Sequence, residues 1–248
     1  MHEPMQRESV GDRVTMQGET ATQAAPVSTR LAGVLFDMDG TLFDSEKLWD
    51  VSLDELAASL GGTLSTATRK SLVGSNLYES IDLVHKDLGV DADPERSGLW
   101  LLRRTKELFA EGLPWKPGAQ QLLTAVRAAG VPRALVTSTH RELTDVALGN
   151  FPDGTFDVVI CGDEVTHTKP HPESYLTAAS RIGVAAADCV AIEDSPRGIA
   201  SAEAAGCAVV AVPSEVPIDA GPRRVVIDSL VGVTVDWLAA LPGRLTAE

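Results

Sequence analysis

The sequence contains no long hydrophobic run and only a few cysteines. No uninterrupted apolar stretch reaches the roughly 18 residues that a membrane-spanning helix needs, and the N-terminal residues carry no apolar segment typical of a signal peptide. The three cysteines, Cys161, Cys189 and Cys207, show no Cys-x-x-Cys spacing, and two of them lie in apolar runs. We therefore expect buried thiols in a cytoplasmic protein that does not cross a membrane.

Positive charge is also scarce. The chain has 21 Lys and Arg residues against 35 Asp and Glu residues, and its formal net charge is -14. This balance argues against nucleic acid and anionic membranes as partners, because electrostatic repulsion would oppose both. It does not exclude a small anionic substrate, which responds to local fields and to metals. The length of 248 residues suffices for one α/β domain and a small accessory domain.

Residues 1–29 contain no aromatic side chain and no hydrophobic periodicity. Their mixed polar composition predicts a disordered tail. The alternative is a start codon placed too early. No internal repeat or low-complexity tract follows this segment.

From residue 133 onward, short apolar stretches alternate with helical ones. Each apolar stretch is rich in Val, Ile or Leu, as strands covered on both faces must be. Together with a first strand near the N-terminus, the predicted strands are 31–37, 133–137, 156–160, 189–194 and 207–212. Helices are predicted between Pro117 and Gly130, from Pro172 onward, and from Ser195-Pro196 to Gly206. This succession predicts an α/β fold with a Rossmann-like parallel sheet flanked by helices.

Residues 46–114 interrupt this alternation, because they contain no strand candidate. Two runs have apolar residues at helical spacing: Trp49, Leu53, Leu56 and Leu60, then Leu77, Ile81, Val84 and Leu88. Asp93-Pro94 predicts the start of a third helix, with Leu99, Leu102 and Phe109 on its apolar side. We expect an all-helical domain at 46–114, inserted into a discontinuous core domain of residues 30–45 and 115–248.

Polar side chains follow several of the predicted strands. Asp37 and Asp39 end the first strand, Thr137 and Ser138 end the second, and Glu193 and Asp194 end the fourth, while Lys169 lies in a loop after the third. Because the carboxyl ends of parallel strands share one edge of the sheet, these side chains should meet in one crevice.

Crowded carboxylates raise one another's pKa unless a cation neutralises them. Oxygen ligands of this kind suit Mg²⁺, which takes one or two carboxylates together with a substrate phosphate. Near a lysine, one carboxylate could attack phosphorus and a second, two residues on, could transfer the proton. Gly40 would let the backbone turn sharply after the pair. A solvated turn and a calcium loop are the alternatives, but an EF-hand needs a third aspartate and a preceding helix, which are missing here.

Four segments together resemble the motifs of the haloacid dehalogenase superfamily of phosphohydrolases. In order, "DMDGTLFD", "ALVTS", "TKPHP" and "IEDS" are similar to its first to fourth motifs, and they lie within residues 31–195. The helical insert stands where that superfamily places a C1 cap, which closes over the site.

The resemblance implies a role for each matching residue. Asp37 would be the nucleophile and a Mg²⁺ ligand, and Asp39 the general acid/base, with its carbonyl on the metal. Phosphate would be bound by Gly40, Thr137, the backbone of Ser138, and Lys169. Asp194 and Glu193 would complete the metal site. Substrate specificity would involve cap residues: Trp49, Gly74, Ser75 and Asn76.

Within the superfamily, the sequence is similar to a branch that includes β-phosphoglucomutase and 2-deoxyglucose-6-phosphatase-like enzymes. Trp49 and Leu77 stand where the mutases have a histidine and an arginine, whereas "DSEKLWD" is similar to the phosphatases. The implied partner is a small phosphorylated metabolite, a sugar or polyol phosphate, and the protein would be a monomer or weak homodimer. A phosphosugar mutase and a non-catalytic regulatory or scaffold protein are the alternatives. Because Asp39 is present, haloacid dehalogenation is disfavoured.

His167 and His171 are four residues apart, which could suggest a metal pair. Pro170 and Pro172 preclude a regular helix at this position, so the spacing does not place the two side chains on one helix face. We expect no metal there.

Overall fold

The computed structural model describes residues 31–245, so the predicted tail at 1–29 lies outside the described residues. The described residues form one six-stranded sheet with the order β3-β2-β1-β4-β5-β6, and every neighbouring pair is parallel. The strands are β1 Gly33–Phe36, β2 Arg133–Val136, β3 Val158–Ile160, β4 Cys189–Glu193, β5 Ala208–Ala211 and β6 Arg224–Val226. The predicted α/β fold with a Rossmann-like sheet is confirmed.

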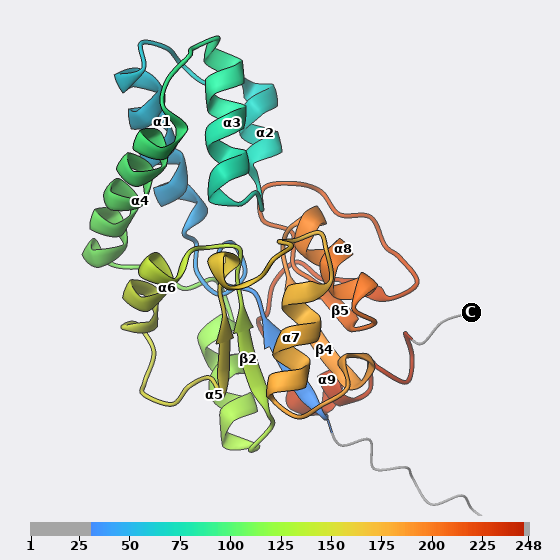
Figure 1. Ribbon diagram of the computed structural model, residues 1–248. Helices are drawn as coiled ribbons and strands as arrows, with labels where there is room; N and C mark the ends of the chain where they lie inside the picture. Colours follow the sequence, from blue (N-terminus) through green and yellow to red (C-terminus); the bar gives the residue numbers. More distant parts are fainter. Residues whose placement is uncertain (1–30, 246–248) are drawn as a thin grey trace, which may run out of the picture.

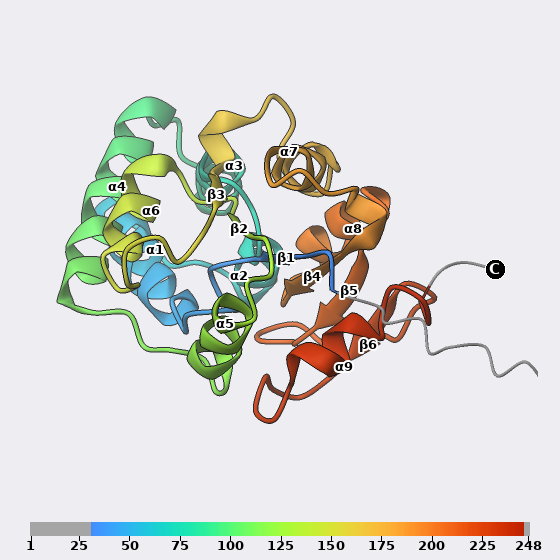
Figure 2. The same ribbon diagram turned by 90° about the horizontal axis from the view of Figure 1, so that it is seen from below.

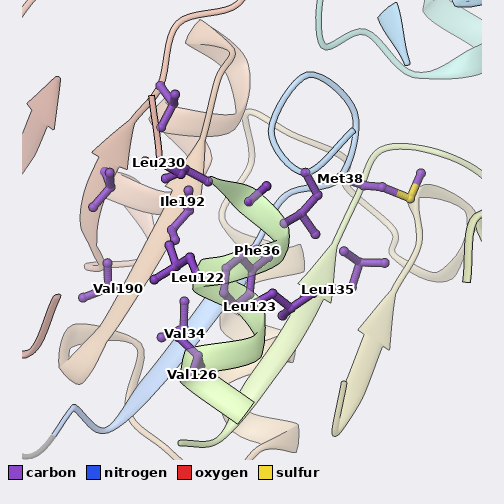
Figure 3. Packing of buried hydrophobic residues seen from close by; sticks show 14 of the residues in the cluster. Val34, Phe36, Met38, Leu122, Leu123, Val126, Leu135, Val190, Ile192 and Leu230 are labelled. Carbon is purple, nitrogen blue, oxygen red and sulfur yellow. The ribbon is translucent and has the colours of Figure 1, made fainter. Parts of the chain in front are cut away.

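Helices cover both faces of the sheet (Figure 2). Val34 and Phe36 of β1 pack in a cluster with α5 and α9, whereas Leu35 faces α7 and α8 on the opposite side. Alternate residues of a strand point to opposite faces, so a strand covered on both sides must be apolar throughout. Figure 3 shows Val34 and Phe36 against Leu122 and Val126 of α5. The helices that flank the sheet are α5 Ala119–Ala128, α6 Arg141–Leu148, α7 Glu173–Arg181, α8 Pro196–Ala204 and α9 Val235–Ala239.

Four helices lie above the carboxyl edge of the sheet (Figure 1). These cap helices are α1 Glu46–Ser59, α2 Thr66–Leu72, α3 Leu77–Leu88 and α4 Pro94–Glu111. They have an apolar cluster of their own, formed by Leu53, Leu56, Ala57, Leu64, Ile81, Val84 and Leu101. We propose that they form the cap domain that the sequence predicts at 46–114.

The prediction for the apolar side of α4 was wrong in one residue. Leu99 is exposed, whereas Leu101 and Leu108 are buried. The buried face also includes Gly98 and Thr105, small residues that let other helices approach. A helix face that is buried partly through small residues is not recognised when only large apolar side chains are sought in the sequence. The sequence pattern also did not predict α2, because none of its residues is buried.

Two further predictions can be compared with the structure. Among residues 31–245, no helix combines the length and the apolar character needed to cross a bilayer. Cys161, Cys189 and Cys207 are free and buried, as expected. Burial raises the pKa of each of these thiols, to about 11 for Cys161 and about 12 for Cys189 and Cys207.

Candidate active site

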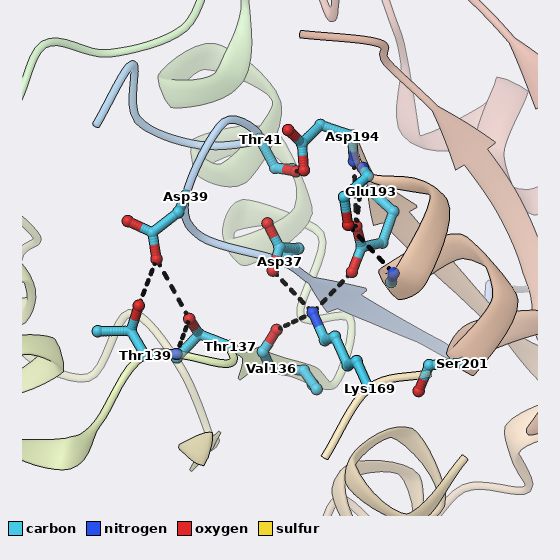
Figure 4. A network of polar contacts seen from close by, with 12 residues as sticks. Asp37, Asp39, Thr41, Val136, Thr137, Thr139, Lys169, Glu193, Asp194 and Ser201 are labelled. Carbon is cyan, nitrogen blue, oxygen red and sulfur yellow. Dashed lines mark hydrogen bonds and ion pairs between the residues drawn. The ribbon is translucent and has the colours of Figure 1, made fainter. Parts of the chain in front are cut away.

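The polar residues that the sequence places at strand ends meet at one edge of the sheet (Figure 4). Asp37 follows β1, which pairs with β2 on one side and with β4, the strand ending at Glu193, on the other. Lys169 reaches into this edge from the loop before α7. Its Nζ donates hydrogen bonds to Asp37 Oδ1 at 2.7 Å, to Glu193 Oε1 at 2.6 Å and to the Val136 carbonyl at 2.9 Å.

This cluster is buried and has an excess of negative charge. Asp37, Lys169, Glu193 and Asp194 are each less than a tenth exposed. Burial, and then the charge of Glu193, raise the pKa of Asp37 to about 8. Burial and the charge of Asp37 likewise raise the pKa of Asp194 well above its usual range. Burial alone would lower the pKa of Lys169, but the carboxylates of Asp37 and Glu193 outweigh it and raise that pKa. One ammonium therefore faces three carboxyl groups.

Two oxygens of the cluster point to a cation. Asp37 Oδ2 and Asp194 Oδ2 are buried and have no hydrogen-bond partner among the described residues. Carboxylate oxygens of Asp37, Asp194 and Glu193 lie within 4.8 Å of one another. Buried oxygens without a donor are costly, and a hard divalent cation would satisfy them. The donor set therefore fits Mg²⁺.

Gly40 allows the turn after β1 to pass close to the carboxylate of Asp194. Its φ is +78°, and an ideal Cβ at this position would lie 2.1 Å from Asp194 Oδ2. Any side chain would therefore both strain the backbone and displace Asp194.

Glu193 is the most thoroughly bonded member of the cluster. Its Oε1 accepts from Lys169 Nζ and from Tyr175 Oη at 2.7 Å, and its Oε2 accepts from the backbone amide of Asp194 at 3.1 Å. These bonds orient Glu193 toward Lys169. Tyr175 was not predicted from the sequence, because it stands among the residues of α7 that pack against the sheet and so resembles an ordinary core residue.

Asp39 is turned away from the other carboxylates. Its Oδ1 accepts from Ser45 Oγ at 2.6 Å and from Trp49 Nε1 at 3.3 Å. Its Oδ2 accepts from Thr139 Oγ1 at 2.7 Å and from Thr137 Oγ1 at 3.3 Å. The carboxylate thus bridges the end of β2 and the start of the cap helices. Ser45 and Thr139 were not predicted, although each lies within a few residues of a motif.

A cavity of about 290 Å³ opens over the cluster, between the core and the cap helices. The predicted residues that line it are Asp37, Asp39, Trp49, Gly74, Ser75, Thr137, Ser138, Lys169 and Asp194. Asn76 is not among the lining residues. Its side chain instead accepts from the Glu79 amide at 3.0 Å and donates to Thr168 Oγ1 at 2.9 Å.

Glu46 also lines this cavity and was not predicted. It accepts a hydrogen bond from Ser214 Oγ, which in turn accepts one from Lys116 Nζ at 2.8 Å. Burial raises the pKa of Glu46. One feature of the sequence could have indicated Glu46, namely that it is an acidic residue shortly after the first motif.

His167 and His171 lie close together, although no helix joins them. Their rings are 4.5 Å apart, and His167 Nδ1 lies 2.9 Å from Glu173 Oε2. The loop therefore brings His167 and His171 together, although their spacing on a helix did not predict this. Both Glu173 oxygens already accept backbone amides, from Thr166 and His167, which accounts for the position of this carboxylate.

Comparison with known proteins identifies the family of this chain. A family model described as haloacid dehalogenase-like hydrolase matches residues 34–212. The chain belongs to this family. The resemblance that the four motifs carried is confirmed.

Individual relatives support the same branch. Over 118 residues the chain is 40% identical to protein CbbY of Rhodobacter capsulatus, covering 46% of this chain and 52% of the relative. Over 182 residues it is 31% identical to hexitol phosphatase B of Escherichia coli K12, covering 69% and 78%. It spans about half the length of the first two curated relatives. The crystal structure of CbbY from Rhodobacter sphaeroides with phosphate superposes with a TM-score of 0.71 at 26% identity, over 82% of this chain and 96% of that one.

Proposed function

We propose that this protein is a Mg²⁺-dependent phosphatase that hydrolyses a small phosphorylated metabolite through an aspartyl-phosphate intermediate. The observation that carries the proposal is the buried cluster of Asp37, Lys169, Glu193 and Asp194, three of which (Asp37, Lys169 and Asp194) line a small cavity. Phosphoryl transfer needs positioning and cancellation of charge more than other chemistry, and this cluster offers both.

We further propose a sugar or polyol phosphate as the substrate. The similarity to a hexitol phosphatase supports this class, and a cavity of about 290 Å³ suits a small leaving group. Trp49, Gly74 and Ser75 line its cap side and would contact the leaving group.

Mg²⁺ would be held by Asp37, Asp194 and the backbone carbonyl of Asp39, with Glu193 as a further ligand or as the residue that orients Lys169. When bound, it would neutralise the carboxylates and the charge of the phosphoryl oxygens. Lys169 already donates to Asp37 Oδ1, which leaves Oδ2 without a protein donor. The ammonium would also offset charge between the incoming phosphoryl group and the nucleophile.

In the first step, an oxygen of Asp37 forms a bond to phosphorus and the ester P–O bond breaks. Asp39 donates a proton to the departing alkoxide. In the second step, Asp39 takes a proton from water, which attacks phosphorus and releases Asp37 and inorganic phosphate. Thr137, Ser138, Gly40 and Lys169 would bind the phosphoryl oxygens throughout.

An aryl phosphate assay tests the proposal. The pure protein should release phosphate with Mg²⁺ and stop when EDTA is added. Asp37→Asn should abolish turnover, because the amide cannot act as the nucleophile. Asp82→Asn is the matched control, since Asp82 is an exposed residue of α3 that pairs with Lys86. Full activity of Asp37→Asn, or a rate insensitive to EDTA, would refute the mechanism.

The same protein separates the alternatives. A mutase supplied with β-glucose 1-phosphate would yield glucose 6-phosphate, whereas a phosphatase would yield free phosphate. A scaffold protein would yield neither, with or without metal. We expect free phosphate, because Trp49 donates to Asp39 from the position where the mutases have a histidine.

A further inference from the structure

A short loop of the cap contacts the core beside the candidate active site. This cap loop, residues 74–79, joins α2 to α3 and includes the first turn of α3. Asn76 donates to Thr168 Oγ1 at 2.9 Å, across 92 residues of sequence. Gly74 passes so close to the core that an ideal Cβ there would lie 2.9 Å from Ser195 Oγ. The loop therefore lies against the two segments that carry Lys169 and Asp194.

Arg197 makes the charged contact in this region. Its Nη2 lies 2.7 Å from Glu79 Oε2 and 2.9 Å from Oε1, and it also donates to the Lys169 carbonyl at 2.8 Å. A single guanidinium therefore bonds both the cap loop and the backbone of the lysine that holds Asp37. The Arg197 and Glu79 side chains are 31% and 42% exposed, so solvent screens part of this ion pair, and the bond to the Lys169 carbonyl adds to it.

A second ion pair between cap and core provides a comparison. Lys106 of α4 lies 2.6 Å from Glu142 of α6, but these side chains are 44% and 59% exposed. Neither residue lines the cavity or bonds a residue of the buried cluster. Such an exposed pair contributes little, because water and salt screen it.

We propose that Arg197 is a positioning residue that couples closure of the cap loop to the placement of Lys169. With the loop in contact, Glu79 holds the guanidinium, and the guanidinium holds the Lys169 carbonyl. When the loop moves away, the guanidinium loses its partner and the lysine loop loses part of its support. Substrate retention and the position of the ammonium thus depend on one side chain outside the four motifs.

The kinetic part of the test rests on the proposed phosphatase function, so a second measurement uses the protein alone. Four single variants are compared with the wild type: Arg197→Met, Arg197→Lys, Glu79→Gln and Lys106→Met. Glu79→Gln removes the charge but keeps an oxygen that can accept from the Asn76 amide, a bond at 3.4 Å in the capping box of α3. Hydrogen exchange of amides 74–80 reports on the loop, and kcat and KM report on the site.

Arg197→Met should speed exchange in the cap loop about fivefold and raise KM about tenfold, the size expected for loss of a partly exposed ion pair together with one hydrogen bond. kcat should fall as well, because Lys169 is less firmly placed. Arg197→Lys should recover most of both effects, since an ammonium can also bond Glu79 and a carbonyl. Glu79→Gln combined with Arg197→Met should be no worse than Arg197→Met alone. Lys106→Met should match the wild type.

Unchanged exchange in Arg197→Met, or additive effects in the double variant, would overturn the proposal. Equal effects of Lys106→Met and Arg197→Met would also overturn it, because any ion pair between cap and core would then serve. If the wild type releases no phosphate, the proposed function fails, and the exchange measurement alone decides on Arg197.

Discussion

Gly198 shows how closely individual residues are fitted around the buried cluster. An ideal Cβ at this position would lie 1.8 Å from Glu193 Oε1, in the first turn of α8. Glu193 cannot move aside freely, because Lys169 and Tyr175 both donate to it. The absence of a side chain at residue 198 is therefore a requirement of the site and not of the helix.

Gly198→Ala should consequently displace Glu193 and with it Lys169. We expect a loss of about 1–3 kcal/mol in the free energy of unfolding from overpacking, and a fall in kcat/KM on the order of 100-fold from the misplaced ammonium. Gly243→Ala is the control, because a Cβ at residue 243 meets nothing within 4 Å. Denaturant melts and phosphate release measure the two effects. Wild-type kinetics in Gly198→Ala would show that Glu193 does not position Lys169.

Asp37 makes the stability of the metal-free protein depend on pH. Its pKa is raised from 3.8 to about 8 in the folded state, first by burial. The folded state thus binds the proton more tightly than the unfolded chain. The contribution of protonated Asp37 to the free energy of unfolding is therefore present at low pH and is lost as the pH rises. Between about pH 4 and pH 8, the wild type should lose stability relative to Asp37→Asn, which carries no charge there. Denaturant melts of both proteins in EDTA measure this difference, and a difference that stays flat over this range would contradict the raised pKa.

Among the helices, α3 and α4 of the cap begin in the same way but with different consequences. Asn76 caps α3 by accepting from the Glu79 amide, and Asp93 caps α4 by accepting from the Glu95 amide at 3.0 Å. Only the first of these caps also bonds the core, through Thr168. The N-cap residue of α3 is therefore also part of the contact between cap and core.

Asn76→Ala and Asp93→Ala should each cost about 1 kcal/mol of stability, because each removes an N-cap. Only Asn76→Ala should also lower kcat/KM, by about 2- to 10-fold for the lost bond to Thr168. Thermal melts and steady-state kinetics on both variants make the comparison. An equal loss of activity in Asp93→Ala would mean that cap stability, and not the contact with Thr168, limits the reaction.

The two crossings between core and cap are joined to each other. The Asp44 amide donates to the Pro114 carbonyl at 2.8 Å, and the Lys116 amide donates to the Leu42 carbonyl at 2.9 Å. The rings of Phe43 and Trp115 lie 4.6 Å apart. We predict that the cap hinges at this junction, near residues 45–48 and 113–117, because both crossings must bend there. Crystals of open and closed forms that bend elsewhere would contradict this.

The molecule as a whole is acidic, with a formal net charge of -14, yet its proposed substrate is an anion. The general field therefore does not attract the substrate, and attraction must come from charges inside the cavity. In the buried cluster, Lys169 supplies one positive charge against the carboxyl groups of Asp37, Glu193 and Asp194. A divalent cation would cancel this excess of negative charge locally.

Mg²⁺ should therefore stabilise the entire fold. At a concentration 100 times its Kd, binding contributes about 2.7 kcal/mol, which corresponds to a rise in Tm of roughly 5–10 °C for a chain of this size. Asp194→Asn should abolish most of this shift, because Asp194 Oδ2 is one of the two buried oxygens without a donor. Asp82→Asn should keep it. Scanning calorimetry with Mg²⁺ and with EDTA measures the shift, and no response of the wild type to Mg²⁺ would argue against the metal site.

Local features of the chain were enough to predict much of this protein. A strand buried on both faces has to be apolar along its whole length, so the central strands are visible as short runs of Val, Ile and Leu. In a parallel sheet, residues that follow the strands must share an edge, so Asp37, Lys169 and Asp194 could be brought together without coordinates. Helix α2 was not predicted, because it buries no residue and its sequence therefore shows no periodic apolar pattern.

Other features arise only when distant surfaces meet. Arg197 and Glu79 are 118 residues apart, and neither lies in a pattern that marks a partner. The bonds of Asp39 to Thr139, and the exposure of Leu99, likewise depend on which side chains the folded chain brings opposite one another. The spacing of apolar residues follows from the period of a helix or strand, so a short stretch of sequence is enough to show it. Contacts between cap and core depend on the distances and angles between whole elements, which no short stretch of sequence contains.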